Sequence, residues 1–184
     1  MSEGTDVIQF RFYLDAARFH YQQMELNFQD ATKFKYYLLA FLPIARSVTF
    51  VFKKQFHDKE KLMAWYCIKG KELDNNKIMR FFKEMRNVAL KERTPGMRST
   101  SEITWGIDFI IGNPPPVEIE RTKDGREIWR GELPIKSSKV VGYSFSELPK
   151  WFDENPDVMY LCGKYLDELQ KFVTEAENLI EDKE

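Results

Sequence analysis

The chain has 184 residues, of which 43% are hydrophobic and 15% aromatic, so it can bury the core of one domain. Its formal net charge of -1 excludes the strong overall field with which a basic protein attracts nucleic acid or an anionic membrane. Binding of such a ligand must therefore depend on a local group of charges.

The start of the chain is acidic and lacks the basic residues and apolar run of a secretory signal, which predicts a cytoplasmic protein. Residues 36–52 are apolar, but they are fewer than the roughly 20 that a membrane crossing requires, and Arg46 lies among them. We therefore expect the central helix of a bundle and no membrane partner. Cys67 and Cys162 lie in apolar helical patterns, so buried thiols are expected rather than a disulfide.

Apolar residues at intervals of three and four predict a first helix over residues 6–27. A second helix should begin after Asp30, whose carboxylate can cap free amides, and continue to about residue 56. Pro43 lacks an amide donor and should kink or divide it. This helix is expected to be apolar nearly all round. The residues predicted to line one face are Tyr37, Phe41, Ile44, Val48 and Val51, and Leu38 and Phe52 should widen it.

A third helix is predicted over residues 58–69 and should end at Gly70, because glycine tolerates a left-handed cap. The fourth should begin near Asp74 and end before Thr94-Pro95-Gly96. A short helical turn is expected within residues 144–152. The last long helix should begin at Asn155-Pro156 and continue to about residue 180.

Residues 94–143 are rich in glycine and proline and show no helical period, which predicts an irregular insertion. Within it, residues 117–120 and 127–130 alternate on either side of Lys123-Asp124-Gly125, a pattern typical of a β-hairpin. The predicted fold is mainly α, an up-and-down bundle of about five main helices. We expect one helical domain over residues 1–184, with an irregular or β-hairpin insertion at about residues 94–143.

The sequence gives no support for a metal site or a cofactor. His20 and His57 have no second histidine at helical spacing, and neither cysteine has a nearby thiol or imidazole. The chain also lacks a glycine-rich phosphate loop and a nucleophile elbow. We therefore expect neither a metal nor a cofactor.

Arg86 and Asn87, near the end of the fourth helix, are the first candidates for function. Arginine offers a rigid fork of donors that fits a phosphate, and asparagine offers both a donor and an acceptor. In a structural alternative, Arg86 binds the last carbonyls of its own helix or pairs with Glu84 or Glu92. The cations assigned to nucleic-acid binding are Arg46, Lys83, Lys91 and Arg93.

Arg46 is the second candidate, because a charge in the most apolar helix must find a partner. It can extend to solvent, bind a carboxylate such as Glu92, or face the same cleft as Arg86. The sequence leaves these alternatives open.

Residues 41–48, FLPIARSV, and residues 82–92, FKEMRNVALKE, together resemble the HEPN-like helical proteins. Members of this superfamily are helical bundles, often dimeric, and many are ribonucleases. Their motif is an arginine, a polar residue that is commonly asparagine, four variable residues and a histidine. Arg86 and Asn87 match its start, whereas Glu92 occupies the histidine position.

The resemblance implies an RNA- or nucleotide-handling homodimer, either a weak metal-independent ribonuclease or an inactive member. Arg86 would contact phosphate, Asn87 would position it, and Glu92 would be a weak acid/base or a structural replacement. The alternative is a non-catalytic protein-interaction module in which Arg86 forms a structural ion pair. A third hypothesis is a small-molecule sensor with a pocket around Trp65, Tyr66 and Trp105.

Overall fold

The computed structural model describes residues 6–91, 95–105, 118–121, 127–130 and 135–181. Over these ranges the chain is mainly helical, with five α-helices and a small amount of β-structure before the last helix, as the sequence predicted. The contacts divide the chain into two compact units. The helical unit comprises residues 1–98 and 143–184, and the second unit comprises residues 99–142.

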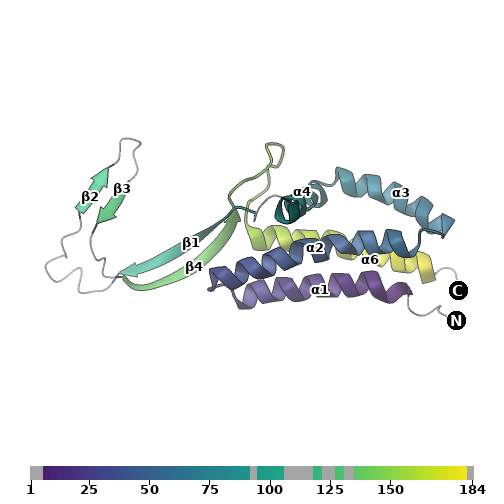
Figure 1. Cartoon of the computed structure of the whole chain (residues 1–184), viewed down its shortest axis with the longest axis horizontal. Helices are drawn as coiled ribbons and strands as arrows, with labels where there is room; N and C mark the ends of the chain where they lie inside the picture. Colours follow the sequence, from purple (N-terminus) through teal and green to yellow (C-terminus); the bar gives the residue numbers. More distant parts are fainter. Residues whose placement is uncertain (1–5, 92–94, 106–117, 122–126, 131–134, 182–184) are drawn as a thin grey trace. The chain divides into compact units, whose positions relative to one another are not determined.

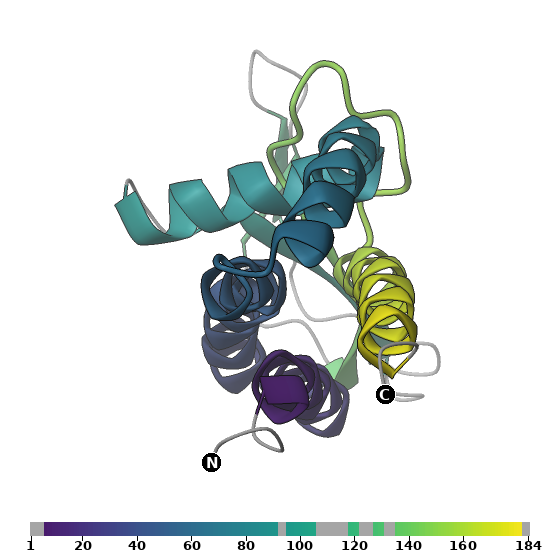
Figure 2. The ribbon, with the colours of Figure 1, turned by 90° about the vertical axis from the view of Figure 1, so that its right-hand side faces the viewer.

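The helices of the helical unit are α1 (Asp6–Leu26), α2 (Ala31–Gln55), α3 (Glu60–Asn75), α4 (Lys77–Lys91) and α6 (Val158–Glu181). α1 and α2 lie side by side, and α6 contacts both (Figure 1). In Figure 2, α1, α2 and α6 are seen nearly end-on, whereas α4 runs across the view. α4 also contacts α2, α3 and α6. α3 and α4 thus lie over one side of the longer helices.

The predicted start of α2 is confirmed. Asp30 Oδ1 accepts hydrogen bonds from the backbone N–H of Thr32 at 3.1 Å and of Lys33 at 3.0 Å. The helix then continues without a break through Pro43, so this proline does not divide it. Proline removes one backbone hydrogen bond, and the packing of α2 against α1 and α6 can offset that loss.

The buried face of α2 differs from the predicted one. Tyr37, Ile44 and Val51 are only partly buried. Tyr36 is 65% exposed and Phe50 is 54% exposed, so part of the apolar surface of this helix faces outward. A sequence this apolar does not mark which side faces its neighbours. The buried residues are Phe34, Leu38, Phe41, Leu42, Ala45, Val48, Thr49 and Phe52.

Among the described residues, α2 is the one helix that is long and apolar enough to cross a membrane. Core helices of soluble proteins share this length and composition. In this structure α2 contacts α1, α4 and α6. Its position inside the helical unit is the one predicted for a central bundle helix.

The predicted boundary between the third and fourth helices is wrong. α3 continues past Gly70 to Asn75. Asn76 then caps α4, because its Oδ1 atom accepts hydrogen bonds from the N–H of Ile78 at 2.9 Å and of Met79 at 3.1 Å. A glycine inside an apolar helix costs only about 1 kcal/mol, which the packing of α3 can offset.

The last helix begins later than predicted. Asp157 is its cap, and its Oδ1 atom accepts a hydrogen bond from the N–H of Tyr160 at 2.7 Å. Asn155 Oδ1 instead accepts a hydrogen bond from the backbone N–H of Asp157 at 3.0 Å. The carbonyl of Pro156 accepts a hydrogen bond from the N–H of Phe145, which ties this residue to a strand. Pro156 therefore precedes the helix.

The described strands are β1 (Met97–Trp105), β2 (Glu118–Arg121), β3 (Glu127–Arg130) and β4 (Ile135–Phe145). β2 and β3 form an antiparallel pair, with Ile119 opposite Trp129, which confirms the predicted hairpin. Its predicted turn residues, 123–125, lie outside the described residues. β1 and β4 form a second two-stranded sheet that the sequence did not predict.

β4 ends in the helical unit, where Tyr143 and Phe145 are buried. The Tyr143 ring stacks on Phe34 at 3.9 Å between centroids, and its hydroxyl donates a hydrogen bond to the carbonyl oxygen of Phe28. The expected helical turn at residues 144–152 is thus wrong at its start, because Ser144 and Phe145 belong to β4. The second unit falls within the predicted insertion, and its status as part of one domain stays a prediction.

Candidate functional site

Arg86 and Asn87 are partly buried residues of α4. Arg86 Nη1 donates a hydrogen bond to Asn87 Oδ1 at 2.9 Å. The Nε atom of Arg86 is buried and has no hydrogen-bond partner among the described residues. Glu92 and Arg93 lie outside those residues, so the acid/base role of Glu92 and the nucleic-acid contact of Arg93 stay predictions.

Tyr165 on α6 lies within electrostatic reach of both candidate arginines. Its ring stacks on Phe82 with 4.3 Å between centroids, and its buried hydroxyl has no partner within the described part of the chain. Burial raises the pKa of this phenol, while the positive charges of Arg46 and Arg86 act to lower the same pKa. Both guanidinium groups therefore act electrostatically on one hydroxyl, but Arg46 lines a pocket that Arg86 does not line, so a cleft shared by the two arginines stays a prediction.

Arg46 is held in place by neutral groups. Its Nη1 atom donates a hydrogen bond to Thr49 Oγ1 at 2.6 Å, and its guanidinium carbon lies 5.0 Å from the centroid of the Phe50 ring. Arg46 makes no ion pair with any carboxylate in the described ranges. Its side chain is therefore positioned without having its charge neutralised there.

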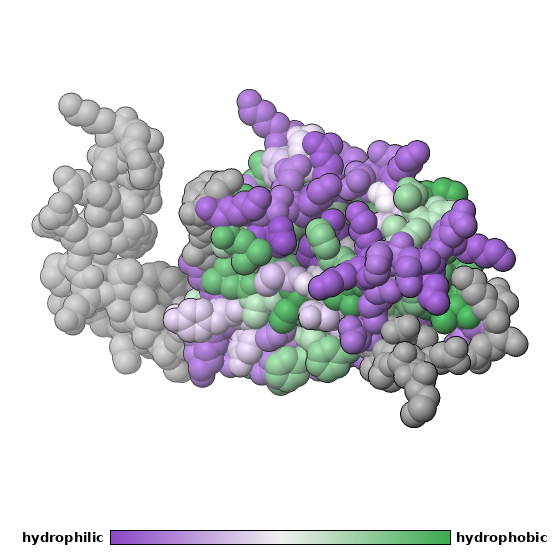
Figure 3. All heavy atoms as spheres, turned by 45° about the vertical axis from the view of Figure 1, so that its right-hand side comes forward, coloured by the Kyte–Doolittle hydropathy of each residue, from purple (hydrophilic) through white to green (hydrophobic). Residues whose placement is uncertain are grey.

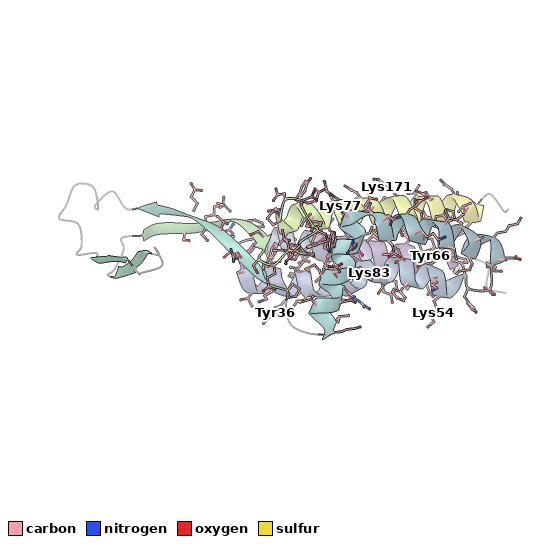
Figure 4. The ribbon with its side chains drawn as sticks, turned by 90° about the horizontal axis from the view of Figure 1, so that it is seen from above. Tyr36, Lys54, Tyr66, Lys77, Lys83 and Lys171 are labelled. Atoms are coloured by element: carbon pink, nitrogen blue, oxygen red, sulfur yellow. The ribbon has the colours of Figure 1, made fainter. Side chains whose placement is uncertain are left out.

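Arg46 also borders a pocket of about 310 Å³ between α2 and α3, called here the Arg46 pocket. Burial raises the pKa of Tyr66, a residue of this pocket, and the charge of Arg46 opposes that rise. In Figure 4, Tyr66 and Lys83 are seen on α3 and α4, the helices that lie over α2. The pocket is lined by Arg46, Thr49, Lys53, Met63, Tyr66, Cys67, Gly70, Lys71, Leu73 and Asp74.

Positive charge exceeds negative charge around the Arg46 pocket. Arg46, Lys53 and Lys71 line it, and none of them pairs with a carboxylate among the described residues. Asp74 is the one acidic lining residue, and its Oδ1 atom lies 2.9 Å from Lys83 Nζ. The pocket can therefore attract an anion even though the whole chain is nearly neutral.

A second pocket of about 280 Å³ lies beside α4 and is called here the Asn87 pocket. Lys83 pairs with Asp74, and Arg80 Nε lies 3.3 Å from Glu84 Oε1. Asp74 also lines the Arg46 pocket, so the two pockets share a wall. The lining residues of the Asn87 pocket are Asp74, Arg80, Lys83, Glu84 and Asn87.

The structure thus places the predicted residues in different surroundings. Arg46 and Asn87 line neighbouring pockets, whereas the positive charge of Arg86 acts to lower the pKa of Tyr165. Lys83 lines the Asn87 pocket but is paired, while Lys91 is exposed at the end of α4. The proposed pairing of Arg86 with Glu84 is not found, because Glu84 contacts Arg80 instead.

The sequence did not identify Lys53, Lys71 or Tyr165 as part of a site. Lysines are frequent throughout the chain, so no local pattern distinguishes these two. The apolar spacing of the last helix places Tyr165 among core residues, so no sequence signal sets it apart as part of a site. The sensor hypothesis did include Tyr66, which lines a pocket, but Trp65 packs on Phe172 at 5.4 Å between centroids. The side chain of Trp105 lies outside the described residues.

The histidines and cysteines lie in separate places. Burial lowers the pKa of His20, and His57 Nδ1 lies 2.9 Å from the carbonyl oxygen of Lys54. Both cysteines are free thiols. Cys162 is buried, but Cys67 is exposed, which corrects the expectation that both are buried. Within the described residues, no group of three or more histidine, cysteine or acidic side chains could hold a metal ion.

Comparison of the chain with known protein families, with curated proteins and with solved structures finds no match. The resemblance to HEPN-like proteins therefore stays a prediction from the sequence. The two pockets and the arginines beside them are the features of the described residues that bear on function.

Proposed function

We propose that the helical unit handles RNA or a nucleotide by binding phosphate groups in the Arg46 pocket. The observation that carries this proposal is the convergence of Arg46, Lys53 and Lys71, from two helices, on one pocket without a carboxylate partner in the described chain. Unpaired cations around a concave surface raise the local concentration of anions. Arginine and lysine are also the side chains that most often neutralise nucleic-acid phosphates.

Arg46 is suited to this role by its fixed position. The hydrogen bond to Thr49 and the contact with the Phe50 ring restrict its guanidinium group before any ligand arrives. A side chain that is already ordered loses less conformational entropy on binding. The guanidinium group has further N–H donors with which it can bind two phosphate oxygens.

Arg86 contributes in a different way. It does not line the Arg46 pocket, but its charge acts on Tyr165, as does that of Arg46. Arg86 therefore adds positive potential from α4 and holds Asn87 through their hydrogen bond. We assign it a supporting role in phosphate binding.

Binding of phosphate in the Arg46 pocket does not by itself cleave RNA. Its family context is the resemblance to HEPN-like proteins, in which an arginine contacts RNA phosphate. Glu92, the residue that would have to move a proton, lies outside the described residues. A ribonuclease reaction through a carboxylate would also require the pKa of Glu92 to be raised before it could donate a proton at neutral pH.

The test measures binding of a short, fluorescently labelled, mixed-sequence RNA by anisotropy over a range of salt concentrations. If three phosphates are neutralised, the logarithm of the affinity should fall against that of salt with a slope of about -2. The variant Arg46→Ala should weaken binding about tenfold or more, since a hydrogen bond to a charged group contributes about 1.5–3 kcal/mol. Lys53→Ala and Lys71→Ala should each reduce the slope.

The matched control is Lys54→Ala. Lys54 adjoins Lys53 in the chain, but it does not line the pocket and lies at the edge of the molecule in Figure 4. This variant should bind like the wild type. Equal loss in Lys54→Ala and Lys53→Ala would show nonspecific attraction, and absence of RNA and nucleotide binding by the wild type would refute the proposal. Electrophoresis of the same RNA after incubation detects cleavage.

A second candidate function is protein interaction, which the outer face of α1 favours. Phe12 is 64% exposed, Phe19 is 51% exposed and Leu26 is 77% exposed. These residues recur at the heptad spacing that pairs helices, so they can form a contact with a second copy of the chain. In Figure 3, hydrophobic residues are also interspersed with hydrophilic ones on the visible face of the helical unit.

A further inference from the structure

We infer that the ligand of the Arg46 pocket is a ribonucleotide unit whose sugar hydroxyls enter the Asn87 pocket. This inference rests on the phosphate binding proposed above and adds the chemical identity of the group attached to the phosphate. It is carried by the composition of the Asn87 pocket and by the wall that the two pockets share.

The residues that line the Asn87 pocket all carry a charged group or an amide at the end of the side chain. Small-molecule sites that hold flat, apolar groups are lined mainly by hydrophobic and aromatic side chains. None of the five lining residues of the Asn87 pocket is aromatic, and the hydroxyl groups of a sugar can each donate hydrogen bonds to their polar groups and accept from them.

Acceptors and donors are both available in this pocket. Asp74 Oδ1 accepts from Lys83, and Glu84 Oε1 accepts from Arg80, so each carboxylate has a second oxygen without a partner in the described residues. Asn87 Oδ1 accepts from Arg86, which leaves the Asn87 amide nitrogen with two N–H donors. The 2′-hydroxyl of a ribose can therefore donate to a carboxylate and accept from the amide, and a free 5′-nucleotide adds its 3′-hydroxyl.

The two ion pairs of the Asn87 pocket do not prevent such binding. The side chains of Lys83 and Asp74 are 48% and 65% exposed, and those of Arg80 and Glu84 are 52% and 39% exposed. Exposed ion pairs contribute little to stability, since water and salt screen them. A hydroxyl group can therefore join these carboxylates at small cost.

The balance of charge decides which part of the ligand enters which pocket. Asp74 lines both, but Glu84 adds a second negative charge to the Asn87 pocket, where Lys83 and Arg80 are already paired. The phosphate is directed towards Arg46, Lys53 and Lys71, where the cations have no carboxylate partner in the described chain. Phosphate and ribose are neighbours in a nucleotide, as these pockets are neighbours in the helical unit.

The test compares RNA and DNA oligonucleotides of the same base sequence, and adenosine 5′-monophosphate with its 2′-deoxy form. The wild type should bind the ribose forms about tenfold more tightly, the effect of one hydrogen bond to a charged group. Asp74→Ala and Asn87→Ala should reduce that preference to about one. Lys71→Ala is the control, because it should weaken binding of RNA and DNA by the same factor. Circular dichroism confirms the fold of each variant.

The outcomes separate this inference from the proposed function. Equal affinity of the wild type for RNA and DNA, with both weakened in Arg46→Ala, would overturn the ribose assignment and leave phosphate binding intact. A ribose preference that persists in both Asp74→Ala and Asn87→Ala would also overturn it, because the preference would then arise elsewhere. If the wild type binds no nucleic acid and no nucleotide, both proposals fail.

Discussion

Tyr165 places a phenol hydroxyl in the interior of the helical unit without a hydrogen-bond partner among the described residues. A polar group in that situation costs about 1–3 kcal/mol relative to a satisfied one. Its ring offsets part of this cost by packing on Phe82 and Phe41. The hydroxyl is therefore a local source of instability beside the two arginines.

We predict that Tyr165→Phe equals or exceeds the wild type in free energy of unfolding at neutral pH, because it removes only the unpartnered hydroxyl. Burial holds the pKa of this phenol above 10.0, the ordinary value, which applies to the unfolded chain. As the pH rises through that value, the unfolded chain loses the phenol proton first, so the wild type loses stability that the variant keeps.

Urea denaturation at neutral and alkaline pH measures this difference. The advantage of Tyr165→Phe should grow as the pH increases past about 10. A variant that is less stable than the wild type at neutral pH by more than about 1 kcal/mol would show instead that the hydroxyl has a partner, such as an ordered water.

At the scale of the elements, side-chain caps decide where helices begin. Asp30 was predictable because a carboxylate precedes a long apolar run. Asn76 was not, because Gly70 offers an earlier stop and Asp74 a competing cap, and tertiary contacts decide between such signals. β1 and β4 were missed for a related reason, since β1 is largely polar and shows little of the alternation that marks a strand.

We predict that Asn76→Ala lowers the free energy of unfolding by about 1 kcal/mol, the usual effect of removing a helix cap. The loss should be larger if the hydrogen bond from Asn76 Nδ2 to Glu168 Oε2, at 3.0 Å, also contributes. Asn75→Ala is the matched control, because Asn75 is exposed and does not cap α4. Thermal unfolding followed by circular dichroism provides the comparison. Similar stabilities of the two variants would contradict the capping role.

At the scale of the whole molecule, the sequence predicted the class of fold and two of the arginines, but not the pockets. Arg46 was identifiable as an unusual charge in an apolar helix, and Arg86 as one half of a short motif. Lys53 and Lys71 become significant only when α2 and α3 are brought together, since neither is distinctive in its own helix. Sites made by separate elements depend on such long-range packing.

We predict that the protein self-associates through α1 and that Phe19→Gln weakens the association by about tenfold. Phe19 lies between Phe12 and Leu26 on the exposed stripe, so the substitution removes apolar contact without disturbing the core. Light scattering coupled to size-exclusion chromatography measures the mass of each protein. The control must be a surface substitution outside the stripe. Phe81→Gln does not qualify, because Phe81 is buried. Lys54→Ala does, and it should leave the mass of the assembly unchanged. A monomeric wild type at high concentration would contradict this prediction.

Asp74 lines the pocket that holds the unpaired cations and also the polar pocket beside α4, and it pairs with Lys83. A change in the charge of Asp74 therefore alters the electrostatic potential in both pockets. We therefore expect an occupant of one pocket to alter the affinity of the other through Asp74, and thermodynamic linkage requires that the factor is the same in both directions. A free phosphate and a free polyol, added together, should bind as a coupled pair.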